Sequence, residues 1–137
     1  MNDMDKNVKN DVFAQFVGIE LVDIQKGFAV TRLNINKNHM NGINIAHGAA
    51  VFALADFAFA AASNSHGIPA VALNVTISYI KAVRSGETLT ATAKEISAGP
   101  KVANYTINVT NDQGDMVAVF QGLAYRKHVP LPDSAMG

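Results

Sequence analysis

One stretch of the chain, residues 49–62, is apolar at every position except Asp56, and eight of its fourteen residues are alanine. A helix that is apolar on all sides has to be enclosed by protein. The stretch is shorter than the roughly 20 residues that cross a bilayer, and it carries a carboxylate. We therefore predict a buried helix at the centre of the fold and no membrane segment.

Runs with β-strand character lie on both sides of this predicted helix. Two precede it, and four follow it, separated by turn residues at intervals of about a dozen residues, which is typical of an antiparallel meander. From Tyr105 to Thr110 apolar and polar residues alternate, so we expect one face of that strand to be buried. The predicted strands are residues 19–24, 28–35, 71–80, 88–96, 102–111 and 116–126.

This order of elements predicts an α+β fold in which a curved antiparallel sheet wraps around one long central helix. A length of 137 residues suits one domain and is short for two, so we interpret residues 1–137 as a single domain. A single sheet would leave one side of the helix uncovered. The pattern therefore favours at least a homodimer.

Both ends of the chain are expected to lie outside this body. Residues 1–15 form an N-terminal segment, and residues 128–137 form a flexible tail. The segment ends in a predicted short helix from Asp11 to Gln15. The residues available for the apolar side of this helix are Val12, Phe13 and Phe16.

The composition excludes several classes of function. Eleven Lys plus Arg balance eleven Asp plus Glu, so we expect neither a nucleic acid nor a membrane surface as partner. The chain has no cysteine, hence no disulfide, thiol nucleophile or thiolate metal site. The first residues lack the basic, apolar and small-residue order of a signal peptide. These features favour a cytoplasmic enzyme.

Asp56 is the residue that points most directly to chemistry. A carboxylate enclosed by apolar side chains is costly unless it is paired or its pKa rises, so a protein that keeps one usually has a use for it. No Lys or Arg lies within two helical turns to neutralise it. The alternative is that Asp56 lies at an exposed edge of the helix or caps a neighbouring backbone group.

His47 and Gly48 mark the point where an Asn-rich loop, residues 36–46, gives way to the helix. The Gly48 amide should be among the unpaired N–H groups of the first turn, which favour negative charge such as the oxyanion of an attacked thioester. A plain helix start would explain the same residues. Gly48 and Asp56 are roughly 12 Å apart along one helix at 1.5 Å per residue. If both act on one carbonyl, they come from different chains of a dimer.

Short motifs around the predicted helix occur in a recognisable order. They are Asn41-Gly42, His47-Gly48 and Leu54-Ala55-Asp56, then Ala58-Phe59-Ala60, Asn64-Ser65-x-Gly67, Ala70-Val71-Ala72, Thr76-Ile77 and the run from Gly86 to Ala93. Together they resemble the signature of the PaaI-type (phenylacetic acid degradation) thioesterases, which are acyl-CoA hydrolases with the hot-dog fold. The resemblance spans roughly residues 40–125.

The resemblance implies roles for four residues. Asp56 would act as nucleophile or as general base for water, and the Gly48 amide would polarise the thioester carbonyl. Asn41 would position the nucleophile or the thioester. His47 corresponds to the family's histidine, although a histidine before a helix more often caps or packs, and we expect it to position Asn41 or the loop.

Two positions depart from the family. Ala49 stands where a second glycine is common, which could narrow the mouth of the pocket. Ala72 stands where some relatives carry a hydroxyl that orients water, so reliance on such a water-holding side chain is not expected in this chain.

The resemblance further implies an acyl-CoA substrate, of the phenylacetyl or another aryl, short-chain or medium-chain type, and no metal or redox cofactor. Phe52, Phe57 and Phe59 could line an aromatic pocket or belong to the core. Lys101, Lys81 and Arg84 could meet the CoA phosphates or simply be solvated. The candidate substrate-binding residues are Phe57, Ala72, Asn74 and Lys101.

Other functions fit the sequence less well. A zinc site lacks ligands at a recognisable spacing, because the four histidines form no i, i+4 pair and no HExxH motif. A non-catalytic acyl-CoA-binding hot-dog domain would not need Asp56. A hydroxyacyl-thioester dehydratase would carry paired motifs that are missing here. The family often forms homotetramers, and we expect at least a homodimer.

Overall fold

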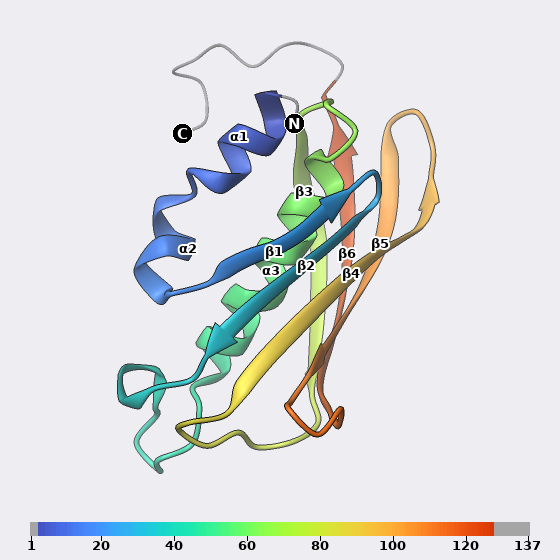
Figure 1. Cartoon of the computed structure of the whole chain (residues 1–137). Coiled ribbons are helices and arrows are strands. Elements are labelled where there is room, and N and C mark those ends of the chain that lie inside the picture. Colours follow the sequence, from blue (N-terminus) through green and yellow to red (C-terminus); the bar gives the residue numbers. More distant parts are fainter. Residues whose placement is uncertain (1–2, 128–137) are drawn as a thin grey trace.

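The computed structural model describes residues 3–127, in which six antiparallel strands form one sheet around a central helix (Figure 1). The strands are β1 (Glu20–Gln25), β2 (Phe28–Asn34), β3 (Ala70–Tyr79), β4 (Thr88–Ala98), β5 (Val102–Thr110) and β6 (Met116–Arg126). The helices are α1 (Asp3–Lys9), α2 (Val12–Val17) and α3 (Gly48–Asn64), with a 3-10 turn η1 (Lys37–His39). The predicted α+β architecture is confirmed. The predicted tail, residues 128–137, lies outside the described residues.

The order of strands across the sheet is β1-β2-β4-β5-β6-β3, so β1 and β3 are the edges. The β1–β2 hairpin turns at Gly27, whose φ of 72° is easily reached only by glycine. The register slips once in β3, between Ala72 and Asn74, and once in β4, between Glu95 and Ser97. Such irregularities bend strands and increase their twist, which helps the sheet to curve around a helix.

The central helix α3 is enclosed as its sequence predicts. It packs against all six strands, and its buried alanines allow the sheet to approach closely. Phe59 lies with its ring centroid 5.7 Å from that of Tyr105 and 5.8 Å from that of Phe120. Phe52 contacts the same Phe120 ring at 5.4 Å. Phe52 and Phe59 therefore belong to the aromatic part of the core.

The N-terminal segment contains two helices, α1 and α2, and both pack against α3 (Figure 1). They cover part of the helix surface that a single sheet would leave open. Asp11 caps α2, because its Oδ1 accepts a hydrogen bond of 2.9 Å from the Ala14 amide. The chain then leaves α2 through Gly18 in a left-handed conformation.

The predicted apolar side of this short helix lies on the surface. Ala14 is the residue that α2 buries, whereas Phe13 is 63% exposed, Phe16 is 86% exposed and Val12 is exposed as well. A six-residue helix that lies against α3 does so through its smallest side chain, since alanine permits close approach. The larger apolar groups are left on the surface.

Within residues 3–127, none of the helices combines the length and the hydropathy needed to span a bilayer.

Candidate active site

The amino end of α3 leaves one backbone donor free. His47 is the N-cap: its Nδ1 accepts from the Ala49 amide at 2.9 Å, and its carbonyl accepts from the Ala50 amide at 2.9 Å. These bonds satisfy donors that every helix start exposes. Among the described residues, the Gly48 N–H donates to no protein group. Because it lies at the positive end of the helix dipole, it is a ready donor to an oxyanion.

The loop before the helix is shaped by Asn41. Its Oδ1 accepts from the amides of Ile43 at 3.0 Å and Ile45 at 3.2 Å, which folds the loop back on itself. Asn41 and Gly48 line the same pocket of about 350 Å³. The structure thus brings together two of the predicted site residues, and the Asn41 oxygen is already used inside its own loop.

Asp56 is half-buried, and among the described residues it has no hydrogen-bond or ion-pair partner. Burial raises the pKa of its carboxyl above the ordinary value of 3.8, and the negative charge of Asp11 raises it further. A carboxylate with a raised pKa that faces no cation is the state expected of a general base or nucleophile. It lies two helical turns beyond Gly48, roughly 12 Å along the axis at 1.5 Å per residue.

The four candidate substrate-binding residues do not lie together. Phe57 is buried next to α2 and lines a pocket with Asp11 and Ala14. Ala72 is on the exposed part of edge strand β3. Asn74, two residues on, lines a groove on the face of the sheet opposite α3, together with residues of β4, β5 and β6. Lys101 is exposed in the β4–β5 turn.

Of the other basic candidates, Lys81 lies on the rim of the Gly48 pocket and is paired with Asp115 at 2.7 Å. Arg84 is exposed close by, where its amide donates to Glu87. No group of three or more His, Asp or Glu side chains within residues 3–127 lies close enough to hold a metal ion.

Sequence reasoning missed two residues beside the site. Tyr79, on the edge strand β3, donates its hydroxyl to the Gly48 carbonyl at 3.0 Å. Asp11 caps α2, and its negative charge raises the pKa of Asp56. Both reach the site across tertiary contacts, and no local spacing in the chain marks either of them.

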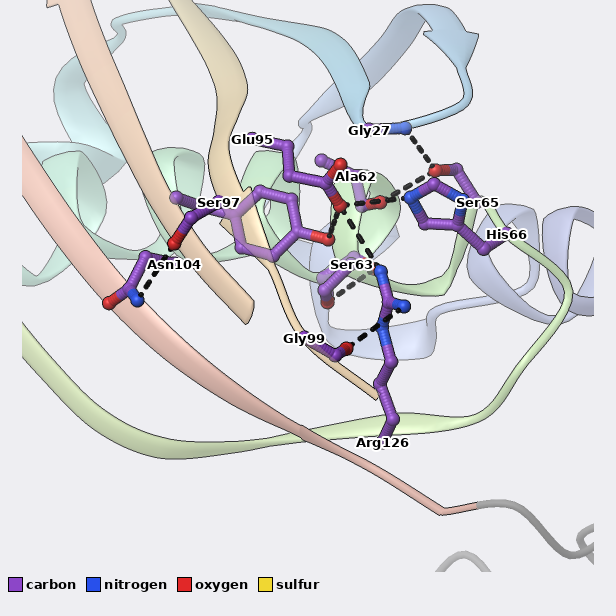
Figure 2. Close-up of polar contacts among 12 residues, drawn as sticks. Gly27, Ala62, Ser63, Ser65, His66, Glu95, Ser97, Gly99, Asn104 and Arg126 are labelled. Atoms are coloured by element: carbon purple, nitrogen blue, oxygen red, sulfur yellow. Dashed lines mark hydrogen bonds and ion pairs between the residues drawn. The ribbon is translucent and has the colours of Figure 1, made fainter. Parts of the chain in front are cut away.

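A second polar cluster, also missed, lies at the carboxyl end of α3 and is centred on Glu95 (Figure 2). Its Oε1 accepts from His66 Nε2 at 2.9 Å, from the Tyr105 hydroxyl at 2.8 Å and from Arg126 Nη2 at 3.2 Å. Burial pushes the pKa of Glu95 up. The hydrogen bonds from Tyr105 and His66, and the charges of His66 and Arg126, outweigh this and hold it below 4.5. The same environment, burial first and Glu95 second, raises the pKa of Tyr105.

The helix end joins this cluster through Ser65. Its hydroxyl accepts from the Gly27 amide at 2.8 Å and donates to the Ala62 carbonyl at 2.6 Å. The Glu95 amide in turn donates to the Gly27 carbonyl at 2.9 Å. The hydrogen bonds and ion pairs of this cluster connect α3 to the β1–β2 turn and to strands β4, β5 and β6. Its role is therefore to stabilise the fold.

Comparison with known proteins identifies the family of this chain. The model of the Thioesterase superfamily matches residues 43–118. The chain is 39% identical over 118 residues to acyl-coenzyme A thioesterase PaaI of Escherichia coli K12, a match that covers 86% of this chain and 84% of the relative.

Two solved structures extend the likeness to three dimensions. The E. coli PaaI protein from the phenylacetic acid degradation operon matches with a TM-score of 0.86 and 38% identity, over 89% of this chain and 88% of that one. A Streptococcus mutans protein solved with acetyl CoA bound matches with a TM-score of 0.78 and 25% identity, over 81% of this chain and 90% of that one. The chain belongs to the thioesterase superfamily and is a thioester hydrolase with the hot-dog fold.

Proposed function

We propose that this chain hydrolyses acyl-CoA thioesters to a carboxylic acid and free CoA, with phenylacetyl and related aryl-acyl groups as its substrate class. The observation that carries the proposal is the free Gly48 N–H at the positive end of α3, a helix of 17 residues. A relative named as an acyl-CoA thioesterase and a structural neighbour solved with acetyl CoA support the CoA part of the substrate. The operon of the E. coli protein supports the aryl class.

In the proposed reaction, the thioester carbonyl oxygen accepts a hydrogen bond from the Gly48 amide, which stabilises the charge that develops there. The Asp56 carboxylate either removes a proton from an attacking water or attacks the carbonyl carbon itself. The C–S bond then breaks, and CoA leaves as a thiolate that takes up a proton. In the second route, water hydrolyses the resulting mixed anhydride. Neither route requires a metal or a redox cofactor.

The two residues are proposed to come from different subunits of a homodimer. Edge strand β3 offers ten residues without a charged side chain, which is an unprotected edge for pairing. The opposite edge strand, β1, carries Glu20 and Asp23. Antiparallel pairing of β3 with β3 of a second copy would bring the two α3 helices together. A homotetramer, built from two such dimers, is the larger assembly that we propose.

Asp56→Asn tests the catalytic part of the proposal. Release of free thiol from a panel of aryl-CoA and alkyl-CoA thioesters should fall at least about 1,000-fold, as for other members of a catalytic unit. Binding of acyl-CoA, followed by calorimetry, should persist. Undiminished hydrolysis would remove Asp56 from the mechanism, and a wild type that binds but never hydrolyses would identify a binding domain instead.

A mixed dimer tests whether sites are shared. Gly48→Pro removes the N–H. The backbone at the first position of a helix accepts proline, and the added side chain also displaces the Tyr79 ring. Each homodimer, Asp56→Asn or Gly48→Pro, should be inactive. A random mixture should recover about a quarter of the wild-type activity, because half of the dimers would hold one intact site of two. No recovery on mixing would place both residues in one chain or show that they do not act together.

A further inference from the structure

Tyr79 connects the edge of the sheet to the first turn of α3. It is the last residue of β3, and its hydroxyl donates to the Gly48 carbonyl at 3.0 Å. Tyr79 is 54% exposed, yet its ring lies against the helix start and lines the pocket that also contains Asn41 and Gly48. The hydrogen bond between Tyr79 and Gly48, which are 31 positions apart in the chain, therefore holds the backbone next to the free Gly48 amide.

The tyrosine ring also accounts for the glycine at position 48. Gly48 is helical and does not have a positive φ, so its backbone conformation is open to any residue. A Cβ placed on Gly48 would lie 3.1 Å from Tyr79 Cζ and 3.2 Å from its hydroxyl oxygen. That is tighter than ordinary van der Waals contact, so the ring has to give way before a side chain fits. The ring can lie this close without shifting only because residue 48 has no Cβ.

We propose that Tyr79 is the positioning residue for the Gly48 amide, an inference that rests on the proposed function. The peptide group after Gly48 is held on both sides, by Tyr79 at its carbonyl and by His47 Nδ1 at the Ala49 amide. The peptide group before it is held at the His47 carbonyl by the Ala50 amide. Because the peptide groups on both sides of the Gly48 Cα are held by hydrogen bonds, the Gly48 N–H keeps one direction before substrate arrives. Donors that are oriented in advance stabilise an oxyanion best.

Tyr79→Phe tests this with the ring retained and only the hydrogen bond lost. We expect kcat to fall about 10-fold, a fraction of the 100-fold to 1,000-fold effect of deleting an oxyanion donor. KM should stay within about twofold, because the lost interaction matters in the transition state. Tyr125→Phe, on the exposed face of the neighbouring strand β6, is the matched control and should leave both constants unchanged.

A purely structural role for Tyr79 would lower the melting temperature and leave kcat per folded molecule unchanged. If the wild type hydrolyses acyl-CoA and Tyr79→Phe keeps the wild-type kcat, the positioning role is wrong while the proposed function stands. If the wild type hydrolyses no acyl-CoA, the proposed function itself fails.

A double-mutant cycle tests the steric part separately. Gly48→Ala should reduce kcat strongly in the wild type, because its methyl group displaces the ring. In a Tyr79→Leu background, which removes the aromatic atoms that the methyl group would meet, the further loss from Gly48→Ala should shrink to about threefold or less. An equal loss in both backgrounds would show that the ring is not what demands glycine. The Tyr79→Phe measurement stands even if the leucine variant does not fold.

Discussion

The polar groups at the two ends of α3 differ in whether they have hydrogen-bond partners within the protein. At the carboxyl end, His66, Tyr105 and Arg126 all donate to one carboxylate, Glu95 (Figure 2). At the amino end, the Gly48 N–H has no protein acceptor among the described residues. Asp56, at the middle of the helix, likewise has no donor there. The carboxyl end uses its polar groups to hold the fold, whereas the Gly48 amide and the Asp56 carboxyl have no partner among the described residues.

The difference appears in the electrostatics of the two carboxyl groups. Both are partly buried, and burial raises the pKa of each. For Glu95 the donors around it outweigh burial and lower the pKa, whereas for Asp56 a second carboxylate, Asp11, adds to burial. A lowered pKa means that the fold stabilises the charge, and a raised pKa means that the charge costs stability. Glu95, beside the carboxyl end of α3, thus contributes to stability, whereas Asp56, at the middle of the helix, has the environment expected of the reactive group that we propose.

The largest effect should come from breaking the carboxyl end. Glu95→Ala leaves Arg126, which is only 12% exposed at its side chain, without its countercharge. Removal of one partner from a buried ion pair typically costs about 3 kcal/mol or more. We expect a loss of that size in the free energy of urea-induced unfolding, measured at fixed protein concentration. The kcat of the folded fraction should not change, because Glu95 contacts neither Gly48, at the amino end of α3, nor Asp56, at its middle.

The matched control is the exposed ion pair between Arg32 and Glu20, which has a similar N–O distance of 3.0 Å. Exposed pairs contribute about 0.5 kcal/mol or less. Glu20→Ala should therefore leave the unfolding curve nearly unchanged. If Glu95→Ala were equally mild, or if it abolished activity in protein that is still folded, the separation of the Glu95 cluster from the proposed site would be wrong.

A smaller effect, of opposite sign, is expected at Asp56. Since the pKa of its carboxyl is raised in the folded state, its charge costs stability at neutral pH, where the group is ionised in the unfolded chain. Asp56→Asn should therefore unfold at a higher urea concentration than the wild type at pH 7. The advantage should vanish as the pH falls below 3.8, where the group is protonated in both states.

As the pH falls, the contribution of Glu95 to the free energy of unfolding should decrease, whereas the destabilising effect of Asp56 disappears. The Glu95 contribution is fully present above the ordinary pKa of 4.5 and is lost as the pH falls through the lower value of the folded state. Unfolding curves of Asp56→Asn and Glu95→Gln, followed from neutral to acidic pH, would check both signs. An Asp56→Asn variant less stable than the wild type at pH 7 would contradict the assignment.

The sequence predicts the helix, the strands and their order because the patterns that mark them lie within short stretches of the chain. The apolar run around Asp56 marks the helix, the alternating runs mark the strands, and the turn residues separate them. The Gly48 amide lies free at the helix start for a similar reason: a first-turn N–H has no acceptor within its own helix, and the adjacent His47 pairs with the amides of Ala49 and Ala50 instead. Each of these features is encoded within a few neighbouring residues.

What the sequence does not predict depends on contacts between distant segments. Glu95 looks like an ordinary polar residue of a strand until the fold brings His66 and Arg126 to it. Tyr79 looks like one more aromatic residue of a strand, although its ring lies 3.1 Å from where a Cβ at position 48 would stand. The sequence pattern groups Val12, Phe13 and Phe16 on one apolar side of α2, but it does not show which side meets the rest of the fold, and these residues are exposed.

The smallest expected effect concerns Asp11, whose negative charge links the N-terminal helices to the electrostatics of Asp56. Asn caps a helix as well as Asp does, so Asp11→Asn keeps the bond to the Ala14 amide and removes only the charge. Without that charge Asp56 ionises more easily, and its pKa falls. In the proposed reaction Asp56 acts in its ionised form, so the acid limb of the pH profile of kcat/KM should move to lower pH.

Two further variants separate charge from structure at this position. Asp11→Ala removes the cap as well, so it should shift the acid limb in the same direction and also lose about 1 kcal/mol of stability. Asp112→Asn removes a charge of the β5–β6 turn that does not contribute to the raised pKa of Asp56, so the acid limb should not move. A limb that does not move in Asp11→Asn would mean that burial alone sets the pKa of Asp56. The amino-terminal helices would then contribute packing, but no charge, to the surroundings of Asp56.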